Sequence, residues 1–240
     1  MPQKSDIVAQ LQAEISRMEG FKPASSVSRD TALGPVSEAF PSGSFPVGAV
    51  HEFMPARSND DAATTAFVAG LVASLMGTCG AALWISSSTK VFPPGLKHYG
   101  IEPDRVIFID LKNEKDVKSA MEEALKCSAL SAVIAEMQSL DFTSSRRLQL
   151  AVEQSQVTGF VLRNDHSLNA TACVSRWKIA SMESERVGTL PGIGFPRWKV
   201  ELLRVRGGKP GAWEIKWMHG KFMHASQPAP SIQEQKRKVG

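Results

Sequence analysis

The sequence predicts an α/β protein with a mainly parallel central sheet flanked by helices, to which the C-terminal third adds antiparallel strands. Two observations carry this prediction. Between residues 49 and 163, short and nearly continuous apolar runs alternate with helical segments, as expected of strands in a sheet covered on both faces. After residue 170, apolar and polar residues alternate as in strands, without a convincing helix. The 240 residues are long enough for one such domain, and the 42% that are hydrophobic can fill its core.

The N-terminal residues 1–20 predict a helix, which is a candidate for oligomerisation. Its apolar residues recur on one helical face, at Ile7, Leu11, Ile15 and Met18. Residues 21–48 are rich in proline, serine and glycine, so we expect a linker that leads into the core. The core is expected over residues 49–222, and residues 223–240 are expected to form a basic disordered tail.

The elements of the core follow from the pattern in chain order. The first strand is expected over residues 49–54, followed by a helix of small residues over 60–77. Further apolar strands are expected at 81–86, 105–110, 131–136 and 158–163, with helices near 113–126 and 143–156. Three alternating strands are expected to add antiparallel to the edge of the sheet, at 171–180, 197–206 and 212–218.

The connection between the first strand and its helix lacks the chemistry of a phosphate-binding loop. Residues 49–77 have the strand, loop and helix on which a GxxxxGK[ST] loop is built, but neither its glycines nor its lysine. Asp60 stands where the lysine belongs in one register, and Ala63 does so when Thr64 is aligned with the usual threonine. Asp60 and Asp61 would also lie at the positive end of the helix dipole and repel a triphosphate. We therefore expect a degenerate loop and no cofactor, although any strand–helix unit can contain such a turn.

Composition argues against several classes of protein. No run approaches the length of a transmembrane helix and the N-terminus lacks the apolar stretch of a signal peptide, so we expect a cytoplasmic protein without a membrane partner. The three cysteines have no CxxC spacing and the five histidines no metal spacing, which argues against a disulfide framework or a metal site. GxSxG, HExxH and paired-carboxylate patterns are also missing from the sequence, so no catalytic residues are predicted.

Positive charge is concentrated near the C-terminus. Residues 196–240 contain ten Lys or Arg and three acidic residues, whereas the whole chain has a net charge of +4. Charged and apolar residues alternate near 197–206, and the candidates for binding DNA or a partner are Arg197, Lys199, Arg204, Arg206 and Lys209. Single-stranded DNA would also require exposed aromatic side chains, but the tryptophan spacing favours burial. Three interpretations stay open: nucleic-acid binding, an acidic protein partner, and a solvated strand face.

Several longer motifs are more specific than this pattern of elements. They are Gly48-Ala-Val-His-Glu-Phe, Phe92-Pro-Pro-Gly-Leu, Tyr99-Gly-Ile-Glu-Pro-Asp-Arg, Ser144-Ser-Arg-Arg-Leu-Gln-Leu-Ala and Pro196-Arg-Trp-Lys-Val-Glu-Leu-Leu-Arg-Val-Arg. With them the chain resembles the RecA-fold core and, within it, the ImuA proteins of bacterial damage-induced mutagenesis. In this resemblance Glu136 takes the position of the Walker B acid. Its alternative role is structural, as an acid at a strand end held by a backbone amide or by an arginine such as Arg146.

The resemblance implies a non-catalytic accessory factor in SOS-induced, error-prone translesion DNA synthesis. Such a factor works with a catalytically inactive Y-family polymerase homologue (ImuB-like) and, indirectly, with an error-prone replicative-type polymerase and a sliding clamp. We expect no enzyme activity, because Ser86-Ser-Ser-Thr-Lys stands where a catalytic glutamate belongs and the loop lysine is missing. The alternative is an inhibitor of cell division that resembles SulA. A third reading, an ATPase with an unorthodox loop, requires saturable ATP binding that depends on Glu136.

Residues 20–24 look like an oligomerisation motif. Gly20-Phe21-Lys22-Pro23-Ala24 is similar to the Gly-Phe-x-x-Ala motif that archaeal and eukaryotic recombinases carry between an N-terminal element and the core. The resemblance implies that the linker adds to the sheet edge of a neighbouring copy, with Phe21 in an apolar pocket and Ala24 in a shallow one. The alternative is that Phe21 packs on its own domain.

Overall fold

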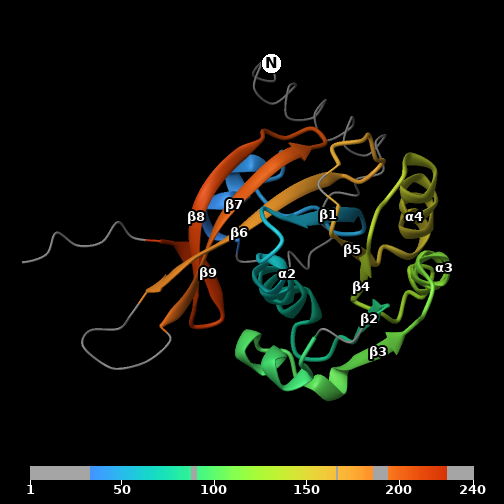
Figure 1. The fold of residues 1–240 in the computed structure, drawn as a ribbon, viewed down its shortest axis with the longest axis horizontal. Coiled ribbons are helices and arrows are strands. Elements are labelled where there is room, and N and C mark those ends of the chain that lie inside the picture. The colour runs from blue at the N-terminus through green and yellow to red at the C-terminus, as the bar shows by residue number, and fades with distance from the viewer. Residues whose placement is uncertain (1–32, 88–90, 166, 186–193, 226–240) are drawn as a thin grey trace, which may run out of the picture.

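The frame of the protein is a mixed sheet, seen in a computed structural model that describes residues 33–87, 91–165, 167–185 and 194–225 (Figure 1). Within these residues the sheet has nine strands in the order β3, β2, β4, β5, β1, β6, β7, β8, β9. Their bounds are β1 Val50–Pro55, β2 Ala82–Ser86, β3 Val106–Asp110, β4 Ala132–Met137, β5 Thr158–Arg163, β6 Ser175–Glu185, β7 Phe195–Val205, β8 Gly211–Met218 and β9 Lys221–His224. Strands β1 to β6 are parallel, and β7, β8 and β9 each pair antiparallel with the strand before.

The predicted α/β class is confirmed, and the fold is consistent with a RecA-like core. Strands β1 to β5 lie within one residue of their expected bounds. The expectation of an antiparallel β6 is wrong, because β6 pairs in parallel with β1 and places Arg176 beside Glu52. Residues 164–174 return from the end of β5 to the start of β1, where the N–H of Val174 donates to the carbonyl of Val50 at 2.8 Å. β9 is an additional strand that the sequence pattern did not predict.

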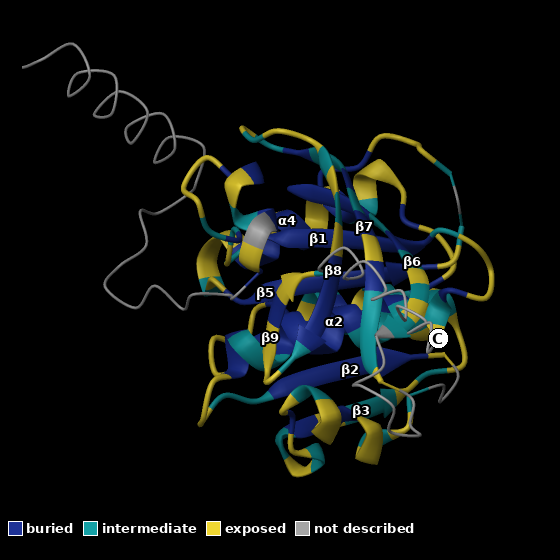
Figure 2. Cartoon of the chain, turned by 90° about the vertical axis from the view of Figure 1, so that its left-hand side faces the viewer, coloured by how far each residue is buried: buried dark blue, intermediate teal, exposed yellow. Residues whose placement is uncertain are grey.

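The three α-helices of the described chain lie on opposite faces of the sheet. The sheet curves around α2 (Asp61–Met76), while α3 (Glu114–Ala124) and α4 (Phe142–Ser155) cover its outer face (Figure 1). Strand β9 reaches α2 closely, since a Cβ added at Gly70 would lie 2.6 Å from the ring of Phe222. Because protein surrounds α2 in this way, the helix is apolar on most of its sides. Figure 2 shows α2 and the central strands as buried.

Short 3-10 helices complete the fold, at η1 (Gly34–Ala39), η2 (Pro93–Tyr99) and η3 (Pro103–Arg105). η1 lies beside β9. Gly34 has a φ of +55°, and a Cβ there would lie 2.7 Å from the carbonyl oxygen of Phe222. Both the backbone angle and this close approach require glycine. The beginning and the end of the described chain therefore lie side by side.

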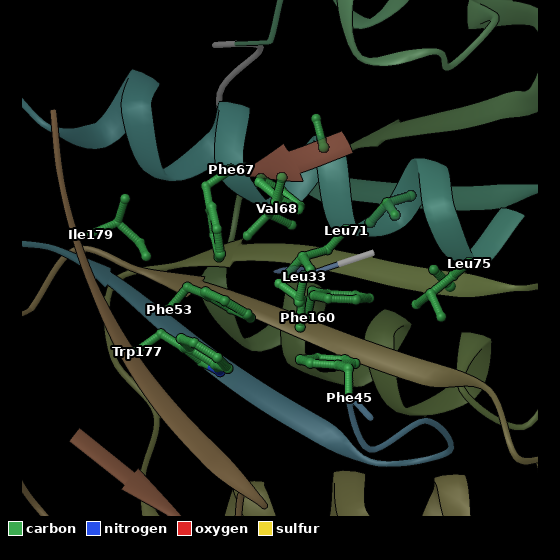
Figure 3. Close-up of a cluster of buried hydrophobic side chains, with 14 of the residues drawn as sticks. Leu33, Phe45, Phe53, Phe67, Val68, Leu71, Leu75, Phe160, Trp177 and Ile179 are labelled. Atoms are coloured by element: carbon green, nitrogen blue, oxygen red, sulfur yellow. The ribbon is translucent and has the colours of Figure 1, made fainter. Parts of the chain in front are cut away.

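Aromatic side chains form a connected group in the core on the α2 side of the sheet (Figure 3). The rings of Phe53 and Trp177 stack with centroids 5.7 Å apart, and Phe160 lies 5.9 Å from Phe53. Phe45 contacts the same group, with its ring centroid 6.2 Å from that of Phe160. These residues come from separate strands and from the segment before β1, so the cluster joins those elements.

The segment expected to be a linker is part of this core from residue 33 onward. Leu33, Val36, Phe40 and Phe45 are all buried, and they belong to the cluster around Trp177. Proline, serine and glycine in this segment support tight turns against the core. Residues 223 and 224, which were expected in the tail, belong to β9. The expected N-terminal helix, Phe21, Ala24 and residues 226–240 lie outside the described residues.

His51 on β1 is buried in a chain of hydrogen bonds. Its Nε2 donates to the carbonyl of Pro46 at 2.7 Å, and its Nδ1 accepts from the hydroxyl of Ser175 at 2.7 Å. The Ser175 oxygen accepts in turn from Nε1 of Trp177 at 2.6 Å. Burial lowers the pKa of His51 to about 3, although the bond to Pro46 acts in the opposite direction. The imidazole is therefore neutral at any pH at which the protein works.

We expect the free energy of unfolding to fall as the pH drops below 6.5. The unfolded chain takes up a proton on His51 in this range, whereas the folded chain does not until the pH approaches its lowered pKa. For an unfolded pKa of about 6.5, the loss of stability from this residue is about 2 kcal/mol at pH 5. Urea denaturation at pH 7 and pH 5 measures it, with His51→Gln as the comparison. Between pH 7 and pH 5, the free energy of unfolding of the variant should fall by about 2 kcal/mol less than that of the wild type. Equal decreases would contradict the conclusion that His51 stays neutral in the folded protein.

Candidate functional site

The loop between β1 and α2 ends at Asp60, whose carboxylate accepts hydrogen bonds from β6. The buried side chain of Asp60 accepts hydrogen bonds from the N–H and the hydroxyl of Ser181, at 3.0 and 2.5 Å. Arg57 donates to the other carboxylate oxygen at 3.2 Å. Burial raises the pKa of Asp60, but the hydrogen bonds from Ser181 and Arg57 together outweigh it, and the pKa lies below its usual range. At neutral pH this carboxylate is ionised and ties the loop to the sheet.

The other predicted residues of the degenerate loop occupy the first turn of α2. Asp61 and Thr64 line a pocket, while Ala63 packs against the core. The hydroxyl of Thr64 donates to the carbonyl of Asp60, four residues earlier, at 3.0 Å. Asp61 adds negative charge at the positive end of the helix dipole. This arrangement disfavours a phosphate group.

Glu136, the predicted Walker B-like acid, lies near the end of β4 and faces the same pocket. Its Oε1 accepts a hydrogen bond from the indole N–H of Trp84 on β2 at 2.8 Å. Trp84 is not among the partners considered from the sequence, because it lies 52 positions away in the chain. The pairing joins β2 to β4 and orients the carboxylate.

The pocket has a volume of about 450 Å³ and lies at the carboxyl ends of β1, β4 and β5. This is the edge at which open α/β sheets bind ligands. One wall is the start of α2 and the other is η2, which contributes Leu96 and Tyr99. Most of the lining is apolar, and Arg163 is its only basic residue in the described part of the chain.

A buried ionic cluster lies on the outer face of the sheet, centred on Glu52 of β1. Its Oε2 lies 3.2 Å from NH1 of Arg163 on β5, and its Oε1 lies 2.8 Å from Nε of Arg176 on β6. The hydroxyl of Thr171 also donates to Oε1, at 2.5 Å. Glu52 and Arg163 have no exposed surface. One carboxylate thus holds together three adjacent strands.

The sequence contains a signal for this cluster. Glu52 lies inside an apolar strand, and Arg163 ends another. A charge in a strand that is covered on both faces needs a buried partner of opposite sign. The pattern could therefore have indicated that Glu52 and Arg163 pair, although Arg176 could not be foreseen without the parallel pairing of β6.

Arg204 and Arg206, two of the predicted DNA or partner contacts, hold the chain that leads into β6. Arg204 donates to the carbonyls of Thr171 and Cys173, at 2.9 and 2.8 Å. Arg206 donates to the carbonyl of Ala172 at 3.3 Å. Replacing either arginine would disturb this segment, so such variants are poor probes of binding.

Arg197 and Lys199 lie on a charged strand face, which we define as Lys178, Arg197, Lys199, Glu201, Glu214 and Lys216. These residues project from β6, β7 and β8 on the side away from α2. Lys199 lies 3.2 Å from Glu201, and Arg197 lies 3.8 Å from Glu214. Four cations and two carboxylates leave this face positive but partly compensated. Lys209 is apart from it, exposed in the turn between β7 and β8.

The tryptophans of these strands face the core. Trp198 and Trp217 are buried, and Trp213 packs against the same cluster from a partly buried position. Their burial agrees with their spacing in the sequence. The charged strand face therefore offers charge but no tryptophan for base stacking.

Neither a metal-binding group nor a membrane-spanning helix is found in the described part of the chain. Within the described ranges, no group of three or more His, Cys, Asp or Glu side chains could hold a metal ion. None of the helices there is both long enough and apolar enough to span a bilayer.

Fold and site together define a class of protein: an α/β protein whose fold is consistent with a RecA-like core, and whose loop between β1 and α2 has neither the glycines nor the lysine of a phosphate-binding loop. No family model matches the chain. It is 36% identical over 194 residues to Protein ImuA of Caulobacter vibrioides strain NA1000 / CB15N, and equally to that of strain ATCC 19089 / CIP 103742 / CB 15. Each match covers 75% of this chain and 80% of the relative. The chain therefore belongs to the ImuA family, and this membership supports an accessory role in damage-induced mutagenesis.

Proposed function

We propose that this protein is a non-catalytic subunit of a complex for SOS-induced, error-prone translesion DNA synthesis. The observation that carries the non-catalytic part of this proposal is the pair of hydrogen bonds between Ser181 and Asp60, which engage with β6 a carboxylate that stands at one of the two positions aligned with the missing lysine. Asp61 and Glu136 add further negative charge to the adjacent pocket. Phosphoryl transfer requires positive groups around the phosphates. Among the described residues of this lining the only basic one is Arg163, which is paired with Glu52 and Asp165. Its partner would be an inactive Y-family polymerase homologue, and through it an error-prone polymerase and a sliding clamp.

The test combines complex formation with nucleotide binding. We expect the full chain to co-purify with the inactive Y-family polymerase homologue of the same organism, and to show no saturable ATP binding in calorimetry. The control is Glu136→Gln, which keeps an acceptor for Trp84 and should change neither result. ATP binding that is lost in Glu136→Gln, without a complex, would instead identify a nucleotide-dependent switch.

Self-association and DNA binding are secondary parts of the proposal. Phe21 and Ala24 would anchor a neighbouring copy, and the molar mass measured in the same experiment reports this directly. DNA or an acidic partner would be attracted by Lys199 and Lys209, which are exposed, more than by the engaged Arg204 and Arg206. Binding through exposed charges should weaken steeply with added salt.

A further inference from the structure

The two edges of the nine-stranded sheet differ in how they are protected. β9, at one edge, lies beside η1 and carries Lys221 and His224. β3, at the other edge, pairs with β2 alone among the described strands and lies at the margin of the molecule (Figure 1). It contains neither proline nor lysine, the residues that commonly guard an exposed edge. An edge of this kind is a ready site for pairing with another strand.

Backbone groups in the middle of β3 face away from the sheet. The N–H of Leu111, which follows β3, donates to the carbonyl of Ser86 on β2 at 2.8 Å. Alternate residues of a strand bond to the same neighbour, so Ile107 and Ile109 also direct their backbone groups toward β2. The N–H and the carbonyl of Phe108 therefore face the open edge, where they can bond to a further strand.

The outer face of the sheet is apolar at this edge. Ile107 lies opposite Leu83 of β2, which belongs to the outer core, yet Ile107 is 55% exposed. Ile109 packs against the same core from a partly buried position. A strand added beside β3 would cover Ile107. We propose that two copies of this protein pair through β3, antiparallel and about a two-fold axis, so that their sheets become continuous.

β3 is complementary to itself in one register. With Phe108 opposite Phe108 of the second copy, all five residues of β3 are paired, and any other register pairs fewer of them. Ile107 then lies opposite Ile109 of the second copy on the outer face. Asp104 and Lys112 are both exposed and stand two residues before and two residues after the strand, so each lies near its opposite charge. Because these charges match at symmetric positions, a second copy fits this edge better than an unrelated strand does.

The contact is closed by its symmetry, and it is small. A two-fold pairing uses the β3 edge of both copies, so it gives a dimer and no longer assembly. It involves one short strand of each copy, so we expect a weak dimer with a Kd of about 10 µM. This dimer goes beyond the proposed accessory function, and it is distinct from the contact predicted for Phe21.

Sedimentation equilibrium of the full chain between about 1 and 200 µM measures the dimer. Ile107→Lys places a charge in the apolar contact at an exposed position, so the monomer should stay folded and the Kd should rise at least about tenfold. The matched control is Leu168→Lys, which makes the same change at a residue that is 68% exposed between β5 and β6. It should leave the Kd unchanged. Circular dichroism verifies that both variants are folded.

An exchange of charges tests the register. Asp104→Lys and Lys112→Asp should each raise the Kd about three- to tenfold, since each brings like charges together twice in the dimer. The double variant restores opposite charges, so its Kd should return to within about twofold of the wild type. Phe21→Ala should not change the Kd.

A monomer at about 200 µM, an unchanged Kd in Ile107→Lys, or a double variant as weak as the single ones would each overturn the inference. Loss of the dimer in Phe21→Ala would overturn it as well, because the linker and not β3 would then join the copies. Co-purification with the polymerase homologue is a separate measurement. Failure of the dimer therefore leaves the proposed function intact, and the reverse also holds.

Discussion

Replacing Glu52 by glutamine should lower the free energy of unfolding by about 3–5 kcal/mol. The substitution keeps the shape of the side chain but removes the charge that Arg163 and Arg176 share. Arg176, which has very little exposed surface, is then buried without a carboxylate partner. Arg163, which has no exposed surface, keeps only Asp165 at 3.1 Å. Removing one partner of a buried ion pair is strongly destabilising for this reason, even where the pair itself contributes little. Urea denaturation at pH 7 measures the change.

The matched control is Glu201→Gln on the charged strand face. Glu201 also has two cationic neighbours, Lys178 at 3.7 Å and Lys199 at 3.2 Å, but its surroundings are solvated. Exposed pairs contribute about 0–1 kcal/mol, so this variant should be nearly as stable as the wild type. If the two variants lost similar amounts of unfolding free energy, burial of the cluster around Glu52 would not be the reason why Glu52→Gln is destabilising.

Replacing Phe45 by alanine should cost about 3–5 kcal/mol, as for other fully buried phenylalanines. Phe45 is 3% exposed and its ring lies 5.8 Å from Phe40, 4.2 Å from His51 and 6.3 Å from Trp177. The truncation leaves a cavity among rings that stack on one another and cannot close readily. Thermal unfolding followed by circular dichroism, with urea denaturation, measures the loss.

Val47→Ala, two positions away, is the control for this prediction. Val47 is 49% exposed, so its truncation should change stability by less than about 0.5 kcal/mol. If Phe45→Ala were equally mild, residues 33–48 would be a linker as their composition suggests. The contrast between the two variants therefore decides whether this segment belongs to the folding unit.

The strands β1 to β5 could be predicted because strands buried on both faces appear in the sequence as uninterrupted apolar runs. The direction of β6 could not be predicted, because alternation of apolar and polar residues shows that a strand has two different faces but not which strand it pairs with. The sequence pattern also did not show that part of residues 33–48 is buried. The proline, serine and glycine content of this segment is typical of linkers, and only the positions of Phe40 and Phe45 in the fold show that they face the core.

The sequence predicted where the residues of the candidate site lie, but not which residues they form hydrogen bonds with. Asp60 was expected at the start of α2 and lies there. Its partner Ser181 is 121 positions away in the chain, so only the completed sheet brings the two together. The same applies to Glu136 and Trp84. Local pattern identifies which side chains have unusual chemistry, whereas long-range topology decides what they contact.

The contact between Gly34 and Phe222 has a consequence for the segments that flank the fold. Residues 1–32 carry the candidate motif with Phe21, residues 226–240 carry three basic residues in a row, and both start from this one place. For a macromolecule that binds both segments, binding to one segment raises the effective concentration of the other. Two weak contacts would then give a much higher overall affinity than either contact alone. Affinity tags at either terminus are attached to segments that leave from the same spot.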